Sequence, residues 1–177
     1  MSDSPSYRLG TKALHAGHTP DCATNHDLSY ARSRDMAHWE TSAGRPLQLP
    51  IRLATAEIVD PVPVNGGIIN GNNRVGFDSK NRPVITYHKF DPQGRTQLYN
   101  ARLENGRWKI YRTTDWDYRW EFSGGGSIHF EIRPGAIRRE GRDLLLDYAH
   151  DRYGAGTWRL DEATLRPLET RERARRW

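Results

Sequence analysis

The sequence has very little cysteine and no long apolar segment, and both absences restrict what the chain can be. Its single cysteine, Cys22, cannot form an internal disulfide or a cysteine-rich zinc site, so we interpret it as a plain thiol. No apolar run approaches the roughly 20 residues that a membrane-spanning helix needs. The segment from Met1 to Ser6 lacks the basic start and the apolar stretch of a signal peptide. We therefore expect no membrane partner and no signal peptide in this chain.

Hydrophobic residues are also scarce, but aromatic residues are not. Of 177 residues, 36% are hydrophobic and 28% charged, yet six Trp, eight Tyr and four Phe are too many for a disordered chain. The net charge is +5, from 27 Lys and Arg against 22 Asp and Glu. These cations are scattered, and the densest run, residues 171–177, is typical of a solvated basic tail. We therefore expect no nucleic-acid partner, whereas an acidic polysaccharide remains a candidate.

Helical periodicity is nearly absent, and the pattern predicts an all-β chain. Short runs rich in β-branched and aromatic residues alternate with clusters of Gly, Asn, Asp and Pro. Asp91-Pro-Gln-Gly94 and Asn105-Gly106 are strong turn signals between such runs. The clearest stretch predicts four strands joined by three tight turns, which together form one antiparallel meander: 74–78, 82–90, 96–103 and 107–113.

The meander repeats, which is the signature of propeller blades. A second unit is predicted over 135–139, 143–150, 154–160 and 165–169. Upstream, Leu28–Arg32 before Trp39 matches Leu98–Arg102 before Trp108, and indicates half of a third unit. Repeated four-stranded units of this kind build β-propellers, which close with about four to eight blades. We therefore predict a partial β-propeller of about two and a half four-stranded antiparallel blades, a segment rather than a closed ring.

This count divides the chain into three parts. Residues 1–20 lack strand periodicity and form a poorly patterned N-terminal segment, 21–170 form the propeller segment, and 171–177 form the basic tail. An incomplete propeller exposes a blade face and open strand edges, which favour association. We therefore expect self-association through unpaired blade faces.

Five motifs in order resemble one family. They are Asn25–Ser33, Asp60–Val64 with Gly66–Asn72, Tyr87–Asp91, Gln97–Arg102 and Trp116–Gly126. From residue 21 to about 170 the sequence resembles the BNR-repeat family that contains the seven-bladed ulvan lyases and the rhamnose-glucuronate lyases. The resemblance implies a seven-bladed fold, a secreted or periplasmic location, and β-elimination at a uronic acid of an acidic polysaccharide. It implies no required cofactor, while a structural divalent metal is left open. The family's N-terminal blades, with a further catalytic histidine, have no counterpart in this sequence, which leaves open whether the segment is active by itself.

Strand direction predicts which residues meet at one end of the blades. In β-elimination a base removes the proton next to the carboxylate, and the site needs a cation or donors where negative charge develops. His26 precedes a strand, Tyr87 and His88 end another, and Arg119 lies in a connection between blades, so all four are expected at the same end. The resemblance implies catalytic roles for His26, His88 and Tyr87, and substrate binding by Arg119 and Asn25.

The same reasoning limits this set and leaves alternatives open. Arg32 and Arg102, at the far ends of their strands, are expected away from that end, and Tyr87 and His88 must face opposite sides of their strand. A sialidase-like glycoside hydrolase would need two carboxylates flanking the bond, and Asp78, Asp91, Asp115 and Asp117 are available. A non-catalytic carbohydrate-binding propeller segment is the third hypothesis.

Overall fold

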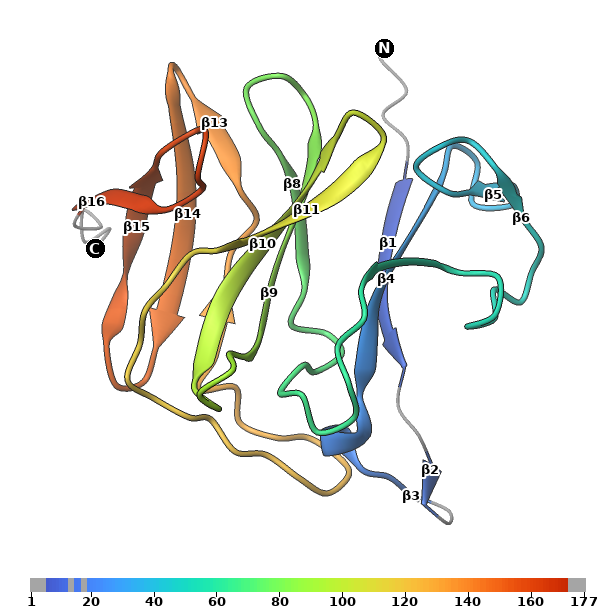
Figure 1. Ribbon diagram of the computed structural model, residues 1–177, viewed down its shortest axis with the longest axis horizontal. Helices are drawn as coiled ribbons and strands as arrows, with labels where there is room; N and C mark the ends of the chain where they lie inside the picture. The colour runs from blue at the N-terminus through green and yellow to red at the C-terminus, as the bar shows by residue number, and fades with distance from the viewer. Residues whose placement is uncertain (1–5, 13–14, 17–18, 172–177) are drawn as a thin grey trace.

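The fold is built from antiparallel sheets that pack side by side (Figure 1). A computed structural model describes residues 6–12, 15–16 and 19–171. In that part of the chain the helical element is one short 3-10 helix, η1 (Cys22–Thr24). No helix there is long and apolar enough to cross a membrane. The all-β prediction is confirmed.

Three sheets of four or five strands follow one another along the chain. The first contains β1 (Ser6–Lys12), β4 (His26–Ser33), β5 (Trp39–Glu40), β6 (Pro46–Leu47) and β7 (Glu57–Asp60). The second contains β8 (Arg74–Phe77), β9 (Pro83–Phe90), β10 (Thr96–Glu104) and β11 (Arg107–Arg112). The third contains β12 (Ile132–Pro134), β13 (Arg138–Glu140), β14 (Asp143–His150), β15 (Gly154–Leu160) and β16 (Pro167–Arg171). Strands β2 (His15–Ala16) and β3 (Thr19–Pro20) form a separate small pair.

The second sheet is the predicted meander, because its turns are encoded locally. At the β9–β10 turn, Oδ1 of Asp91 accepts hydrogen bonds from the backbone amides of Gln93 and Arg95 at 3.0 and 2.9 Å. At the β10–β11 turn, Asn105 and Gly106 have φ of 50° and 76°, the left-handed conformation that an Asn-Gly hairpin requires. Four strands in the order β11-β10-β9-β8 result.

The third sheet agrees with the prediction except in its first strand. Instead of one strand at 135–139, two short strands, β12 and β13, pair with β14 one after the other. Between them the amide of Gly135 donates to the carbonyl of Asp147 at 2.7 Å. A Cβ on Gly135 would lie 3.1 Å from the Asp147 backbone oxygen. The chain therefore passes close to β14 at Gly135. Strands β12 and β13, on either side of this point, have three residues each and are too short to show an alternating pattern.

The first sheet contains a strand from the segment 1–20, which was predicted to lie outside the blade pattern. Strand β1 pairs with β4 from Ser6 opposite Ser33 to Lys12 opposite His26. The interpretation of residues 1–20 as outside the blade pattern is therefore wrong for this strand. Strand pairing uses backbone N–H and C=O groups, so a segment without strong alternation still joins a sheet when a neighbour offers its edge. Of the predicted basic tail, residues 172–177 lie outside the described residues.

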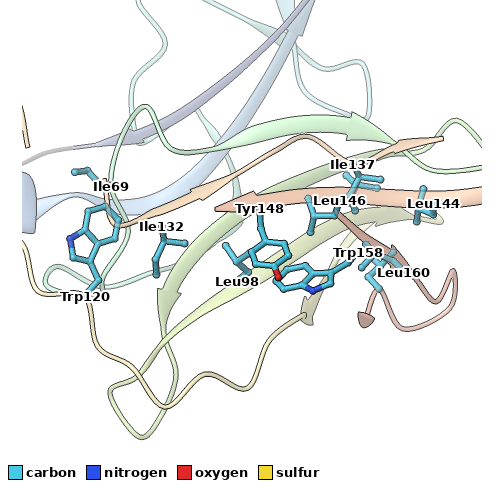
Figure 2. Packing of buried hydrophobic residues seen from close by; sticks show 12 residues of the cluster. Ile69, Leu98, Trp120, Ile132, Ile137, Leu144, Leu146, Tyr148, Trp158 and Leu160 are labelled. Carbon is cyan, nitrogen blue, oxygen red and sulfur yellow. The ribbon is translucent and has the colours of Figure 1, made fainter. Parts of the chain in front are cut away.

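The three sheets are held together by two hydrophobic clusters, one on each side of the second sheet. Odd-numbered residues of β9, such as Ile85 and Tyr87, pack with Leu28 and Tyr30 of β4. Val84 packs on the opposite side, in the larger cluster against the third sheet. Figure 2 shows its members from widely separated segments, including Ile69, Leu98, Trp120, Ile132, Ile137, Leu146, Tyr148 and Trp158. Consecutive antiparallel sheets of four or five strands, packed one against the next, are the arrangement of propeller blades.

Candidate functional site

A cavity is formed at one end of the sheets by η1, the connection after β7, the end of β9 and the connection after β11. Its volume is about 360 Å³, within the range of small-molecule sites. The residues that line it come from four separate segments of the chain: Ala23, Asn65, Gly67, Phe90, Arg119, Glu121, Phe122 and Ser123.

Backbone hydrogen bonds fix these segments to one another. The amide of Phe90 donates to the carbonyl of Gly66 at 2.8 Å, and the amide of Asn65 donates to the carbonyl of Ala23 at 3.1 Å. Gly67 has φ of 78°, and a Cβ on it would lie 2.6 Å from the Phe90 ring. Only glycine fits this position, because both the conformation and the space exclude a side chain. The wall of the cavity is thus formed by contacts between blades.

Arg119 is the cation of the cavity, and its guanidinium is held in place. Nε pairs with Oε1 of Glu121 at 2.6 Å, and Nη1 donates to the carbonyl of Gly94 at 2.6 Å. The guanidinium carbon lies 3.8 Å from the centroid of the Phe90 ring. Among the described residues, Nη2 has no hydrogen-bond partner. Because the side chain of Glu121 is 76% exposed, this ion pair is weak and an incoming anion can replace it.

His26 and Asn25 follow η1 directly. Nδ1 of His26 lies 2.8 Å from Oδ2 of Asp27, and Nε2 is buried without a hydrogen-bond partner among the described residues. If Nδ1 carries the proton that Asp27 accepts, Nε2 keeps its lone pair. Asn25 is buried, and its amide nitrogen donates to the carbonyl of Cys22 at 2.7 Å. The structure places Asn25 as a residue that closes the turn in front of His26.

Tyr87 is fully buried between the first and second sheets. Its hydroxyl donates to Oδ2 of Asp60, which also pairs with Nζ of Lys89 at 2.6 Å. Burial, together with the negative charge of Asp60, raises the pKa of the Tyr87 phenol well above its usual value. Tyr87 therefore keeps its proton at neutral pH and acts as a donor to Asp60.

His88 is fully buried on the other side of β9. Its ring centroid lies 5.0 Å from that of Trp120 and 6.2 Å from that of Phe122. Neither ring nitrogen makes a hydrogen bond of good geometry within the described residues. Burial lowers the pKa of His88 to about 4, a shift that the backbone of Gly67 opposes. Since Gly67 and Phe122 both line the cavity, His88 is a neutral imidazole behind its wall.

The lowered pKa of His88 predicts a loss of stability in mild acid. The unfolded chain binds a proton at this histidine below about pH 6.5, but the folded chain only below about pH 4, so stability falls as the pH drops through this window. Between about pH 7 and pH 5 the loss is about 2 kcal/mol. The free energy of unfolding, measured with urea at both pH values, should therefore fall by about 2 kcal/mol less in His88→Leu than in the wild-type chain. An unchanged pH dependence in the variant would contradict the neutral, buried state.

The predicted residues thus reach the same end of the sheets, but not the same surface. Arg119 lines the cavity, and His26 and Asn25 follow the helix that supplies Ala23 to it, whereas Tyr87 and His88 are covered on opposite faces of β9. Arg102, predicted to lie away from this end, is buried and donates to the carbonyls of Glu162 and Ala163.

Phe90 and Glu121 are residues of the site that were not predicted from the sequence. Both lie inside motifs that carry the family resemblance, at 87–91 and 116–126, so position within a motif is the signal that could have identified them. Their role depends on Arg119, which contacts both from the connection between blades.

The carboxylates considered for a hydrolase have other roles. Asp78 and Asp91 accept hydrogen bonds from the backbone of their own turns. Asp115 pairs with Arg112 and Arg166, and Asp117 with Arg95. In the part of the chain that the structure describes, no group of three or more His, Cys, Asp or Glu could hold a metal ion.

Comparisons with known proteins agree with this architecture. The profile of the family described as "BNR repeat-containing family member" matches residues 12–116. Two solved structures share the fold: one titled as an ulvan lyase of a new family of polysaccharide lyase, with a TM-score of 0.52 and 12% identity, and one titled as that ulvan lyase bound to -[GlcA(1-4)Rha3S]-, with a TM-score of 0.51 and 12% identity. The alignments cover 96% and 94% of this chain but 43% and 42% of theirs, so the chain spans less than half of their length. A comparison with curated protein sequences gave no match.

Proposed function

The chain belongs to the BNR repeat-containing family, and from that premise we propose that its cavity binds a uronic acid residue of an acidic polysaccharide for β-elimination. The observation that carries the proposal is Arg119, whose guanidinium lines the cavity with two nitrogens fixed and the third without a partner among the described residues. A held planar guanidinium suits a carboxylate, because its parallel N–H groups match the two oxygens. The ulvan lyase with the bound saccharide shares this fold and supports a substrate of the same class.

In this proposal Arg119 stabilises the charge that develops during the reaction. The sugar carboxylate displaces Glu121 and pairs with the guanidinium, which lowers the cost of removing the neighbouring ring proton. Phe90 and the Gly94 carbonyl keep the guanidinium in position before substrate arrives. Positioning of this kind needs no reorganisation in the transition state.

We assign the base to His26, which follows the helix that supplies Ala23 to the cavity and whose buried Nε2 must become accessible when substrate binds. This Nε2 has no partner among the described residues, and Asp27 holds the ring through Nδ1. Nε2 takes the proton next to the carboxylate, the bond from the adjacent ring carbon to the glycosidic oxygen breaks, and a carbon–carbon double bond forms. The departing oxygen then takes a proton from water, and Nε2 returns its proton to the resulting hydroxide, which restores the base. Catalytic roles for Tyr87 and His88 stay predictions, since both are fully buried in this structure.

Incubation with ulvan or a rhamnose-glucuronate polymer tests the reaction. The proposal expects ultraviolet absorbance from the unsaturated uronate product. New reducing ends without this absorbance would show that the protein is a hydrolase and not a lyase. Saccharide binding without either product would show that it is a non-catalytic binding segment. A hydrolase is disfavoured because Glu121 is the one carboxylate among the described residues that line the cavity. A secreted or periplasmic location and self-association remain predictions that accompany this proposal.

A further inference from the structure

A second group of aromatic side chains lies at the same end of the molecule, beside the turn between β14 and β15. We call Trp116, Tyr118 and Tyr153 the aromatic platform. The rings of Trp116 and Tyr153 are stacked at an interplanar angle of 14°, with centroids 5.9 Å apart. His150 lies among all three, with centroid distances of 4.5 Å to Trp116 and 4.7 Å to each tyrosine.

The platform is rigid at its base and open at its surface. His150 is buried, and its Nδ1 accepts a hydrogen bond from the amide of Arg152 at 3.0 Å, which fixes the turn. The hydroxyl of Tyr153 donates to the carbonyl of Asp117 at 3.1 Å, yet 37% of this residue is exposed. Trp116 and Tyr118 are half-buried. Fixed, partly exposed rings bind a ligand at little entropic cost.

In the described part of the chain, one cation beside the platform, Arg152, has no carboxylate partner. The guanidinium carbon of Arg152 lies 5.5 Å from the ring centroid of Tyr153 and 6.0 Å from that of Tyr118. Nη1 donates to the carbonyl of Asp117, but Arg152 forms no ion pair among the described residues. By contrast, three neighbouring arginines form ion pairs: Arg95 with Asp117, Arg119 with Glu121 and Arg133 with Asp151.

The platform and the cavity meet at the β9–β10 turn, because Asp117 bonds to Arg152, Tyr153 and Arg95, while the Gly94 carbonyl accepts from Arg119. Residues 113–131 run along this end of the second and third sheets (Figure 1), and within that connection Tyr118 of the platform directly precedes Arg119 of the cavity. The carbonyl of Tyr118 accepts from the amide of Thr96 at 2.7 Å, which ties this point of the connection to β10. Arg119 and the platform are therefore held by the same connection and the same turn.

We propose that the aromatic platform and Arg152 form a second saccharide subsite, which binds an anionic sugar residue of the same polymer that occupies the cavity. The identity of the polymer rests on the proposed function. The C–H face of the sugar ring packs on the exposed aromatic surface, and Arg152 pairs with a carboxylate or sulfate of that residue. A nucleic acid fits less well, because phosphate tracking needs several uncompensated cations and the platform has one.

Calorimetric titration of the full chain with acidic ulvan oligosaccharides of increasing length tests the subsite. Affinity should rise with length, and Tyr153→Ala and Arg152→Ala should each remove roughly a tenfold gain for long oligosaccharides only. Tyr153→Phe should keep the gain. Arg139→Ala is the matched control, because Arg139 is exposed and bonds to Gly141 at the β13–β14 turn. Desulfated oligosaccharides distinguish the anion: a retained effect of Arg152→Ala assigns its partner as a carboxylate, a lost effect as a sulfate.

Equal affinities for short and long oligosaccharides, or no effect of Tyr153→Ala and Arg152→Ala, would overturn the subsite. Tighter binding of single-stranded RNA than of the oligosaccharides would overturn it as well. Failure of the proposed function looks different. In that case Arg119→Ala leaves short-oligosaccharide binding intact and no unsaturated product forms, while the effects of the platform variants persist.

Discussion

Replacing Arg119 with alanine should lower the turnover of a uronate polymer by about 10²- to 10³-fold, as expected for loss of one preorganised donor to the transition state. The Arg119 side chain is 44% exposed and its ion pair with Glu121 is exposed as well, so we expect the variant to fold and the loss to fall on charge stabilisation. The rate of unsaturated product formation measures it. Binding of a short uronate oligosaccharide, measured by calorimetry, gives a second readout that does not depend on turnover.

Arg119→Lys separates charge from geometry. Lysine keeps the positive charge but lacks the planar fork, so we expect only partial recovery of turnover. Glu121→Gln removes the competing carboxylate and should tighten saccharide binding, because the substrate no longer displaces an ion pair. Full activity and full saccharide affinity in Arg119→Ala would show that the cavity is not the site.

The same assay applies to His26. His26→Ala should lower turnover by about 10²- to 10⁴-fold, the usual loss of a general base. Asp27→Asn should have a smaller effect, since it weakens the hydrogen bond that orients the ring but leaves the imidazole in place. Its pH–rate profile should shift, which a purely structural role would not produce. Wild-type turnover in folded His26→Ala would remove this histidine from the mechanism.

The second large effect concerns stability at the opposite end of the sheets. Arg102 is buried, its guanidinium pairs with Glu104, and it donates to the carbonyls of Glu162 and Ala163 in the β15–β16 turn. Arg102→Ala leaves Glu104 without this partner and two carbonyls without a donor. Loss of one partner of a buried charged network costs about 3 to 5 kcal/mol. Urea unfolding at neutral pH should show a decrease of that size.

Arg32→Ala is the matched control. Arg32 pairs with Glu40 at 2.8 Å, but both side chains are about one-third exposed. An exposed pair contributes about 1 kcal/mol or less, so this variant should change stability little. Similar decreases in the free energy of unfolding in the two variants would show that the contacts of Arg102 with the third sheet stabilise the fold no more than an exposed ion pair does.

The sequence by itself determined the elements whose hydrogen bonds are local. The turn at Asp91 and the hairpin at Asn105-Gly106 are made by side chains and backbone angles within a few residues, so the strands on either side were predictable. The alternation of β9 also required Tyr87 and His88 to face opposite sides, as they do. The end of the sheets that receives Arg119 followed from strand direction alone.

Only the tertiary structure decided what covers these residues. Strand β1 joins the first sheet through backbone pairing with β4, which leaves little trace in side-chain pattern. Tyr87 and His88 are both enclosed because a blade packs on each face of β9, and no local pattern reports a neighbouring blade. The fixed position of Arg119 likewise depends on Phe90 and on the Gly94 carbonyl, 25 residues away in the chain. The site therefore depends on contacts between segments that are distant in the sequence. Such contacts produce no periodic pattern, so the sequence predicts the meander but not the site.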